Sequence, residues 1–151
     1  IVRLNRRSGE MRKISNEIND FFNISLDKES KLMVATTNEK RSSISVADAS
    51  NLNVLKQVAG GKYDGIGGVA QTSDGRVVFV SIESGNADIW VMDEDGANRR
   101  QLTFDKAADT NPVVSRDNRT IVFVSNRNGT PNLWRMNFEG GELRQLTARG
   151  D

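Results

Sequence analysis

The sequence contains no cysteine and no histidine among its 151 residues. Without cysteine, no disulfide or reactive thiol contributes to stability or chemistry, and cysteine usage says nothing about the redox compartment. Without histidine, Ser-His-Asp and Cys-His catalytic arrangements and histidine-ligated metal sites are excluded together. A Gly-x-Ser-x-Gly nucleophile elbow is also missing, which excludes that hydrolase centre from this chain. These absences predict a non-enzymatic protein without a cofactor or a metal.

The sequence also has almost no net charge and no long apolar run. There are 21 basic and 20 acidic residues, so the formal net charge is +1, and bulk charge predicts no attraction to nucleic acid or to an anionic membrane surface. No apolar stretch approaches the roughly 18 residues that suggest a membrane-spanning helix, so we expect no direct membrane insertion of this fragment. A secretory signal peptide is not visible, which carries no information about export because the chain begins within a repeat.

The most informative feature that is present is a repeat of 44 residues. The triplets 57–59, 101–103 and 145–147 follow one another at this spacing, and residues 13–15, one period earlier, keep the apolar residue and the small hydroxyl. A repeat of this length is one supersecondary unit that must stack on its neighbours to bury its faces. The sequence therefore predicts an array that serves as a scaffold for binding.

Each repeat reads as four short antiparallel strands. Residues 77–81 return as 121–125, and glycine and asparagine cluster between the apolar runs where hairpin turns need them. The run 77–80 is unbroken, which indicates a strand with apolar neighbours on both faces, whereas the outermost strand around 99–103 is mostly polar. Radially stacked four-stranded blades have this geometry, so the predicted fold is an all-β β-propeller.

The phase of the repeat divides the chain into blades of one propeller domain. Residues 1–15 form a half blade with the third and fourth strands, 16–59 a degenerate blade, 60–103 a blade, and 104–151 a blade with a C-terminal tail. Because propellers close with about 4–8 blades, about three and a half blades indicate a piece of a larger protein. We expect an open apolar blade face that meets either neighbouring blades of the parent chain or a second copy by self-association.

The pattern also predicts individual strands and core residues. In the first whole blade the strands are expected near 21–25, 31–36, 42–47 and 53–58, and again at about +44 and +88. The side chains expected to be buried are Phe79, Val80, Ile89, Val91, Leu102, Phe123, Val124, Leu133 and Leu146.

The residues of the last two repeats resemble a known family. Residues 72–81, 88–93 and 101–103, with a second copy in 115–117, 123–127, 132–134 and 145–147, are similar to the TolB-type, WD40-like propeller repeat. The later copy departs at its first hairpin, where 118–119 replace the usual glycine and one residue is added. The family includes periplasmic propellers, lids of prolyl-oligopeptidase-like hydrolases, and sensor-like propellers of bacterial serine/threonine kinases or winged-helix regulators. The resemblance implies a bacterial protein in the periplasm or another extracytoplasmic space.

The function that follows is binding or sensing of a protein or a small ligand at a loop face. The connections that enter each blade and the turns between its second and third strands share one end of a propeller, and loops on a rigid scaffold carry recognition. The candidate binding residues are Tyr63, Asp64, Phe104, Asp105, Lys106, Asn126 and Arg127. The alternative is an accessory propeller of an enzyme, either a prolyl-oligopeptidase-like hydrolase or a receptor-type protein kinase.

Three further patterns have bland interpretations that we favour. Carboxylates in the linkers between blades could form a glycosidase-like pair, but solvated loop charge and capping explain them: Glu17, Asp20, Asp64, Asp105 and Asp109. Residues 93–96 look faintly like a calcium loop, although turn geometry accounts for the Asp and Gly there. A basic residue precedes each triplet, at Arg12, Lys56, Arg100 and Arg144, which suggests protection of an exposed strand edge.

Overall fold

The computed structural model describes residues 2–5, 7–13, 20–26, 28, 33–38, 41–61 and 63–148. Within these ranges every regular element is a strand, as the sequence predicts. The chain divides into two compact units, Ile1–Lys40 and Arg41–Asp151, which are described separately. In the described part of the chain, no helix has the length and apolar character needed to cross a membrane.

The first unit contains two antiparallel hairpins. β1 (Val2–Leu4) pairs with β2 (Met11–Lys13), in the place predicted for the third and fourth strands of a half blade. β3 (Asp20–Leu26) pairs with β4 (Met33–Asn38), with a register irregularity between Phe22 and Ile24.

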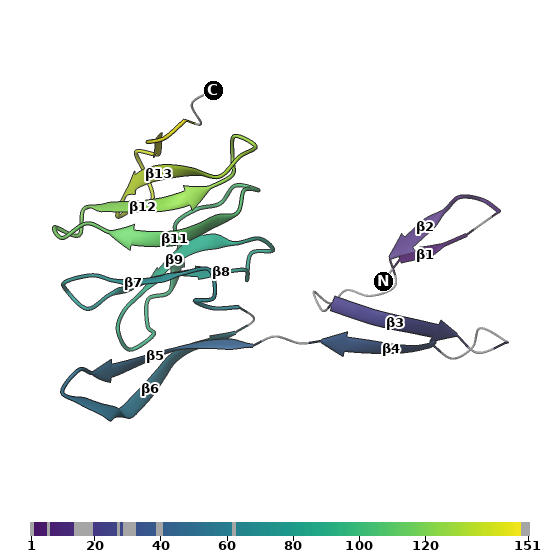
Figure 1. Ribbon diagram of the computed structural model, residues 1–151, viewed down its shortest axis with the longest axis horizontal. Coiled ribbons are helices and arrows are strands. Elements are labelled where there is room, and N and C mark those ends of the chain that lie inside the picture. The colour runs from purple at the N-terminus through teal and green to yellow at the C-terminus, as the bar shows by residue number, and fades with distance from the viewer. Residues whose placement is uncertain are drawn as a thin grey trace. The chain divides into compact units, whose positions relative to one another are not determined.

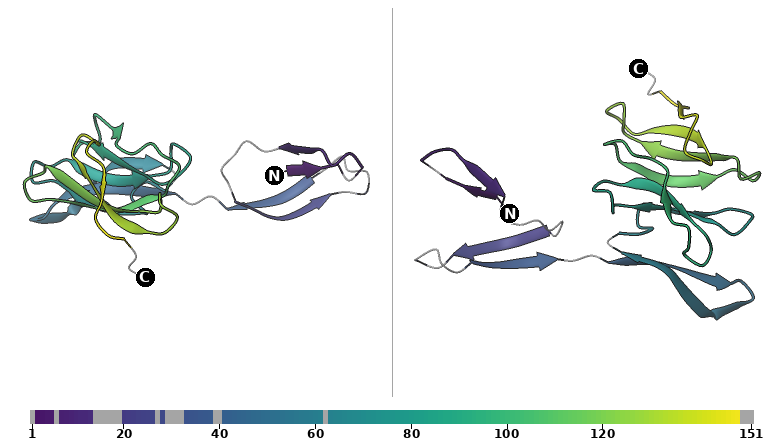
Figure 2. Two further views of the ribbon diagram at one scale, coloured as in Figure 1. Left: turned by 90° about the horizontal axis from the view of Figure 1, so that it is seen from above. Right: turned by 180° about the vertical axis from the view of Figure 1, so that it is seen from behind.

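The second unit contains a hairpin and two four-stranded sheets. Its strands in chain order are β5 (Ser42–Asp48), β6 (Asn51–Gly61), β7 (Val69–Gln71), β8 (Val77–Ser81), β9 (Asp88–Met92), β10 (Arg100–Gln101), β11 (Asp109–Val114), β12 (Thr120–Ser125), β13 (Asn132–Asn137) and β14 (Arg144–Gln145). The strands β7 to β10 form one sheet and β11 to β14 the next, each antiparallel and ordered as in the sequence. These sheets are the predicted blades, and they stack face to face with the β5–β6 hairpin beneath them (Figures 1 and 2).

The first whole repeat differs from the expectation in its pairing. Its four strands lie at the predicted positions, but among the described residues β4 pairs with β3 and β5 with β6, giving two hairpins that belong to different units. This repeat has serine, threonine and alanine where the later copies have unbroken apolar runs, so it has less apolar surface with which to hold four strands together. That residues 16–59 form one blade stays a prediction.

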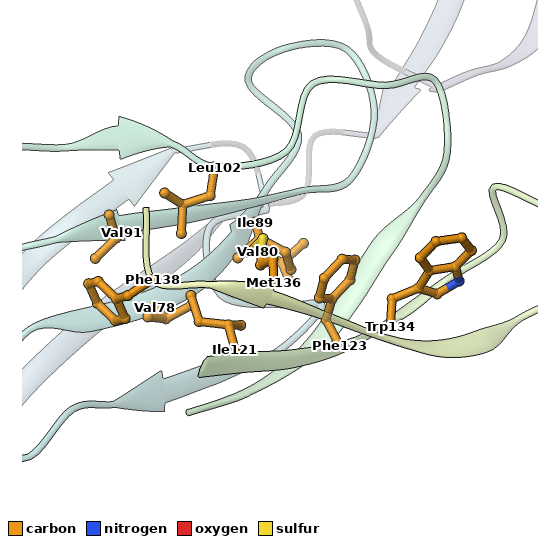
Figure 3. Close-up of a cluster of buried hydrophobic side chains, with 10 residues drawn as sticks. All are labelled: Val78, Val80, Ile89, Val91, Leu102, Ile121, Phe123, Trp134, Met136 and Phe138. Atoms are coloured by element: carbon orange, nitrogen blue, oxygen red, sulfur yellow. The ribbon is translucent and has the colours of Figure 1, made fainter. Parts of the chain in front are cut away.

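The main core lies between the two complete blades. Val78, Val80 and Ile89 of the first sheet meet Ile121, Phe123 and Met136 of the second. Figure 3 shows these side chains pointing toward one another from the two sheets, together with four more buried residues: Val91, Leu102, Trp134 and Phe138. A second cluster joins the first of these blades to the β5–β6 hairpin through Ile44, Ala59, Val77, Phe79 and Met92. Both faces of β8 are therefore buried, as its unbroken apolar run predicts.

Burial of the predicted core residues depends on which blade carries them. Six of the nine are buried as expected: Phe79, Val80, Ile89, Val91, Leu102 and Phe123. The prediction is wrong for Leu133 and Leu146, which are 41% and 48% exposed, and Val124 is only half-buried. Leu133 and Leu146 are the counterparts of Ile89 and Leu102, one period later. Their face of the β11–β14 sheet has no covering layer among the described residues, which is the open apolar face that the repeat predicts.

Matched substitutions at one repeat position test this packing. Ile89→Ala should lower the free energy of unfolding by about 2–5 kcal/mol because it leaves a cavity between two blades. Leu133→Ala, at the equivalent position on the open face, should cost less than about 1 kcal/mol because half-exposed surface contributes little. Urea unfolding of both variants provides the comparison, and equal costs would contradict the described difference in burial.

Candidate functional site

The loops at one end of the two blades form a continuous surface. Two of its segments join the second and third strands of a blade, and the other two lead into the first strand of a blade. These segments are residues 82–87 and 126–131, and residues 63–68 and 102–108. The Asn86 side-chain amide donates to the carbonyl oxygens of Asp105 (3.0 Å) and Ala107 (2.6 Å). The Ala108 N–H donates to Oδ1 of Asn126 (2.8 Å). These bonds join loops from two blades into one surface, here called the loop face.

A buried carboxylate and an arginine hold the first part of this surface. Asp64 is 2% exposed and accepts two hydrogen bonds from the Arg99 guanidinium, at 3.0 and 3.1 Å. The same guanidinium donates to Ser81 Oγ (3.2 Å), forms an ion pair with Glu83 (2.8 Å) and lies about 5 Å from the centroid of the Phe79 ring. A bidentate pair of this kind fixes the loop that enters the blade.

The next blade contains the same arrangement. Asp109 is fully buried and accepts bonds from the Arg127 guanidinium at 3.0 and 3.1 Å. Arg127 also donates to Ser125 Oγ (2.9 Å), pairs with Asp105 (2.9 Å) and lies 4.7 Å from the centroid of the Trp134 ring.

The two arrangements share their parts but take the arginine from different places in the repeat. Serine, phenylalanine and tryptophan recur at intervals of 44 residues, and the aspartate recurs after 45 because one residue is inserted. In contrast, the counterpart of Arg127 is Glu83, and the counterpart of Arg99 is Leu143. The arginine therefore occupies the same place in space beside each aspartate but not the same position in the repeat. For this reason the sequence alone did not reveal Arg99 as a partner of Asp64.

The triplet that recurs every 44 residues, 101–103 and 145–147, connects the outermost strand of each blade to the third strand by side-chain hydrogen bonds. Thr103 Oγ1 accepts from the Ile89 N–H (2.9 Å) and donates to Asp88 (3.3 Å). The Gln101 amide donates to Asp88 and to the Thr103 carbonyl. In the last blade Thr147 accepts from the Leu133 N–H (2.9 Å) and donates to Asn132, the counterpart of Asp88. Burial raises the pKa of Asp88 above its ordinary value, although hydrogen bonds from Ser84 and Thr103 oppose the shift.

Four of the seven candidate binding residues line one hollow. It has a volume of about 620 Å³, and its walls are formed by residues 105–107 and 126–129, which include Asp105, Lys106, Asn126 and Arg127. Phe104 precedes Asp105 in the same loop and is 75% exposed, but it is not one of the residues that line the hollow. Asp64 is buried, and Tyr63 is half-buried with a positive φ of 68°, so these two residues shape the loop and offer little contact surface.

The linker carboxylates are held as structural partners. Asp64 and Asp109 each neutralise an arginine, and Asp105 shares Arg127 with Asp109. Glu17 lies outside the described residues, and the side chain of Asp20 is not described. In the described part of the chain, no group of three or more acidic residues is placed to hold a metal ion.

The loop at 93–96 has the geometry of a tight turn, as the sequence favours, whereas protection of a strand edge by the basic column stays a prediction. Gly96 has a positive φ of 91°, and the Asp95 carboxylate accepts from the Ala97 N–H (2.9 Å), as a tight turn requires. In the basic column, Arg12, Lys56 and Arg144 are exposed, whereas Arg100 forms an ion pair with Glu139 of the following blade (2.8 Å).

The fold and the loop face define a β-propeller module with four-stranded blades whose connecting loops are fixed by buried ion pairs. Residues 23–151 match the family described as the TolB beta propeller domain. The chain belongs to this family.

Individual relatives and solved structures agree. The chain is 44% identical over 45 residues to the Tol-Pal system protein TolB of Geobacter sulfurreducens, a match that covers 30% of this chain and 10% of that protein. It is 40% identical over 54 residues to the protein of the same name from Anaeromyxobacter dehalogenans, covering 36% and 12%. The chain thus matches about a tenth of the length of these curated relatives.

The crystal structure of TolB from Acinetobacter baumannii has a TM-score of 0.64 and 22% identity, with coverage of 95% of this chain and 36% of that one. The structure of putative TolB from Agrobacterium tumefaciens has a TM-score of 0.57 and 16% identity, with coverage of 96% and 68%. At these identities the two structures confirm the fold.

Removal of one arginine tests the buried ion pair. Arg127→Ala should lower the free energy of unfolding by about 3–5 kcal/mol because it leaves the Asp109 carboxylate buried without a counter-ion. The double variant Asp109→Asn, Arg127→Met should recover much of that loss, since no uncompensated charge remains. Chemical denaturation measures both. An Arg127→Ala variant as stable as the parent, or a double variant less stable than the single one, would refute this role.

Proposed function

We propose that this chain is a non-enzymatic propeller scaffold whose loop face binds a protein partner, as part of a larger protein. The observation that carries the proposal is Phe104, a large apolar side chain that is 75% exposed in the same loop as Asp105 and Lys106, which line the hollow of about 620 Å³. Exposed aromatic residues beside a concave surface are the anchors that protein interfaces use most.

The rigidity of the surrounding loops supports this use of the surface. Asp105 and Lys106 follow Phe104, and the Asp105 carbonyl oxygen is held by Asn86 while its carboxylate pairs with Arg127. A partner that binds here therefore meets loops that are already ordered, so little conformational entropy is lost on binding.

The chemistry of the rim suggests what the partner presents. Arg127 is neutralised by Asp105 and Asp109, whereas Lys106 is exposed and has no ion pair among the described residues. We expect an apolar pocket for Phe104 with an acidic group nearby for Lys106, the latter contributing more to association rate than to affinity.

The family matches support a proposal about which system the partner belongs to and in which compartment binding takes place. The curated relatives are named as proteins of a Tol-Pal system, so we propose that the partner belongs to such a system and that binding takes place in the periplasm or another extracytoplasmic space. The family match and the chain's lack of histidine and cysteine support a non-enzymatic role.

Binding to the Pal protein of the same bacterium tests this proposal. Isothermal titration of the purified full chain with Pal should give saturable binding, and Phe104→Ala should weaken it by about 2 kcal/mol or more, as loss of an interface anchor does. Leu55→Ala is the matched control, because Leu55 is also exposed (68%) but lies on β6, away from the loop face. Absence of binding to Pal, or equal losses in the two variants, would contradict the proposal.

A further inference from the structure

The open face of the last blade carries a feature that the covered face of the preceding blade lacks. On the preceding blade, Val78, Val80, Ile89, Val91 and Leu102 are buried against the next sheet. Their counterparts 44 residues later are Val122, Val124, Leu133, Arg135 and Leu146. The apolar character is kept at four positions, but an arginine replaces the buried Val91.

Arg135 stands directly opposite a second arginine. In the β13–β14 ladder Arg135 is paired in register with Arg144, and paired residues of an antiparallel sheet project from the same face. Burial alternates along β13, with Trp134 and Met136 buried against the preceding blade and Arg135 on the other side. Two guanidinium groups therefore share the open face. Like charges at paired positions destabilise a sheet unless something compensates them, and neither arginine has an ion pair among the described residues.

The interface between the two complete blades shows which residues of a covering blade lie opposite these two positions. The counterparts of Arg135 and Arg144 there are Val91 and Arg100. Val91 lies in the same buried cluster as Phe138 of the next blade, and Arg100 pairs with Glu139 (2.8 Å). A layer that covers the open face in the same manner thus brings two consecutive residues of its third-to-fourth-strand turn opposite the arginine pair.

Two partly buried arginines elsewhere in this protein indicate which side chain can meet Arg135. Arg99 and Arg127 lie against aromatic rings, but each also has a carboxylate that accepts two hydrogen bonds from its guanidinium. A phenylalanine alone would leave the donors of Arg135 unsatisfied when the face is covered, and burial of an unpaired charge is strongly unfavourable.

We propose that the open face of the β11–β14 sheet docks another four-stranded blade of this repeat type, and that it selects a blade with two consecutive acidic residues in its third-to-fourth-strand turn. One acid meets Arg144, as Glu139 meets Arg100, and the other meets Arg135 in the place that Phe138 occupies at the existing interface. Continuity with the existing interface and complementary charge both favour this occupant, and docking here is independent of the proposed partner at the loop face.

A longer chain tests the proposal directly. A second copy of residues 104–147 is attached after Thr147, in one version unchanged and in another with glutamate at the counterpart of Phe138; both versions keep the counterpart of Glu139. The natural sequence has no cysteine, so Leu133→Cys introduces a single thiol on the open face, and its rate of alkylation reports how often that face is uncovered.

We expect the glutamate copy to slow alkylation of the cysteine at position 133 by at least about tenfold more than the phenylalanine copy does, which is the effect of one charge-assisted hydrogen bond at the lower end of its usual range. With Arg135→Val in the host, the order of the two copies should reverse. Leu55→Cys is the control, and its alkylation should be unchanged throughout.

Each other outcome argues against the proposal. Unchanged labelling with both copies would show that the face does not dock a blade. Equal protection by the two copies, or better protection by the phenylalanine copy in the Arg135 host, would refute selection of an acidic blade. Labelling of the unextended chain that slows as protein concentration rises would assign the face to a second copy of the chain instead.

Discussion

The apolar contact between the two complete blades is the constraint on which the rest of this structure depends. Five side chains from each sheet form the cluster, and among them Val78, Ile89, Ile121 and Phe123 are fully buried. A sheet of two-residue and six-residue strands has little stability by itself, because each blade has apolar residues on both faces that must be covered. Stacking satisfies this requirement for the shared faces, and it fixes the distance between the loops that the blades carry.

The loop face inherits its order from this stacking. Asp64 and Asp109 lie at the points where the chain enters each blade. Both are buried, and each is bonded to an arginine whose guanidinium lies over an aromatic ring. Backbone bonds between blades reinforce the arrangement: the Asp109 N–H donates to the Ala87 carbonyl oxygen (2.7 Å), and the Asn111 N–H donates to that of Gly67 (2.7 Å). The exposed Phe104 and the hollow lined by Asp105 and Lys106 are thus displayed by loops that hydrogen bonds and ion pairs hold in place.

The sequence predicted the fold because its signals are local and periodic. Unbroken apolar runs such as 77–80 and glycine or asparagine turns recur at 44 residues, and each recurrence supports the same blade. The structure also accounts for Asn118, which stands where the previous copy has Gly75. Asn118 has a positive φ (57°), as Gly75 does, and its side-chain amide donates to Ser73 Oγ of that copy (2.7 Å). The pairing of β3 with β4 and of β5 with β6 was harder to predict from the sequence, because that repeat has neither strong apolar runs nor turn glycines.

The candidate site was only partly predictable, for a different reason. Its loops follow from topology, so Asp105, Lys106, Asn126 and Arg127 were expected on one end and do lie together. The partners of the buried carboxylates were not predictable by phase, because Arg99 and Arg127 approach equivalent aspartates from unrelated repeat positions. The burial of Leu133 and Leu146 was mispredicted because a repeat pattern describes a residue's preferred environment and does not show whether a neighbouring blade is present to provide it.

Native-state hydrogen exchange of the second unit tests most directly the claim that contact between blades stabilises both of them. If the claim holds, the amides of β8, β9, β12 and β13 exchange through one shared opening, with the same free energy and the same dependence on denaturant. Ile121→Ala, in the contact, should lower that free energy for all four strands together. Exchange of β12 and β13 through a separate, lower-energy opening that leaves the protection of β8 and β9 unchanged would contradict the account.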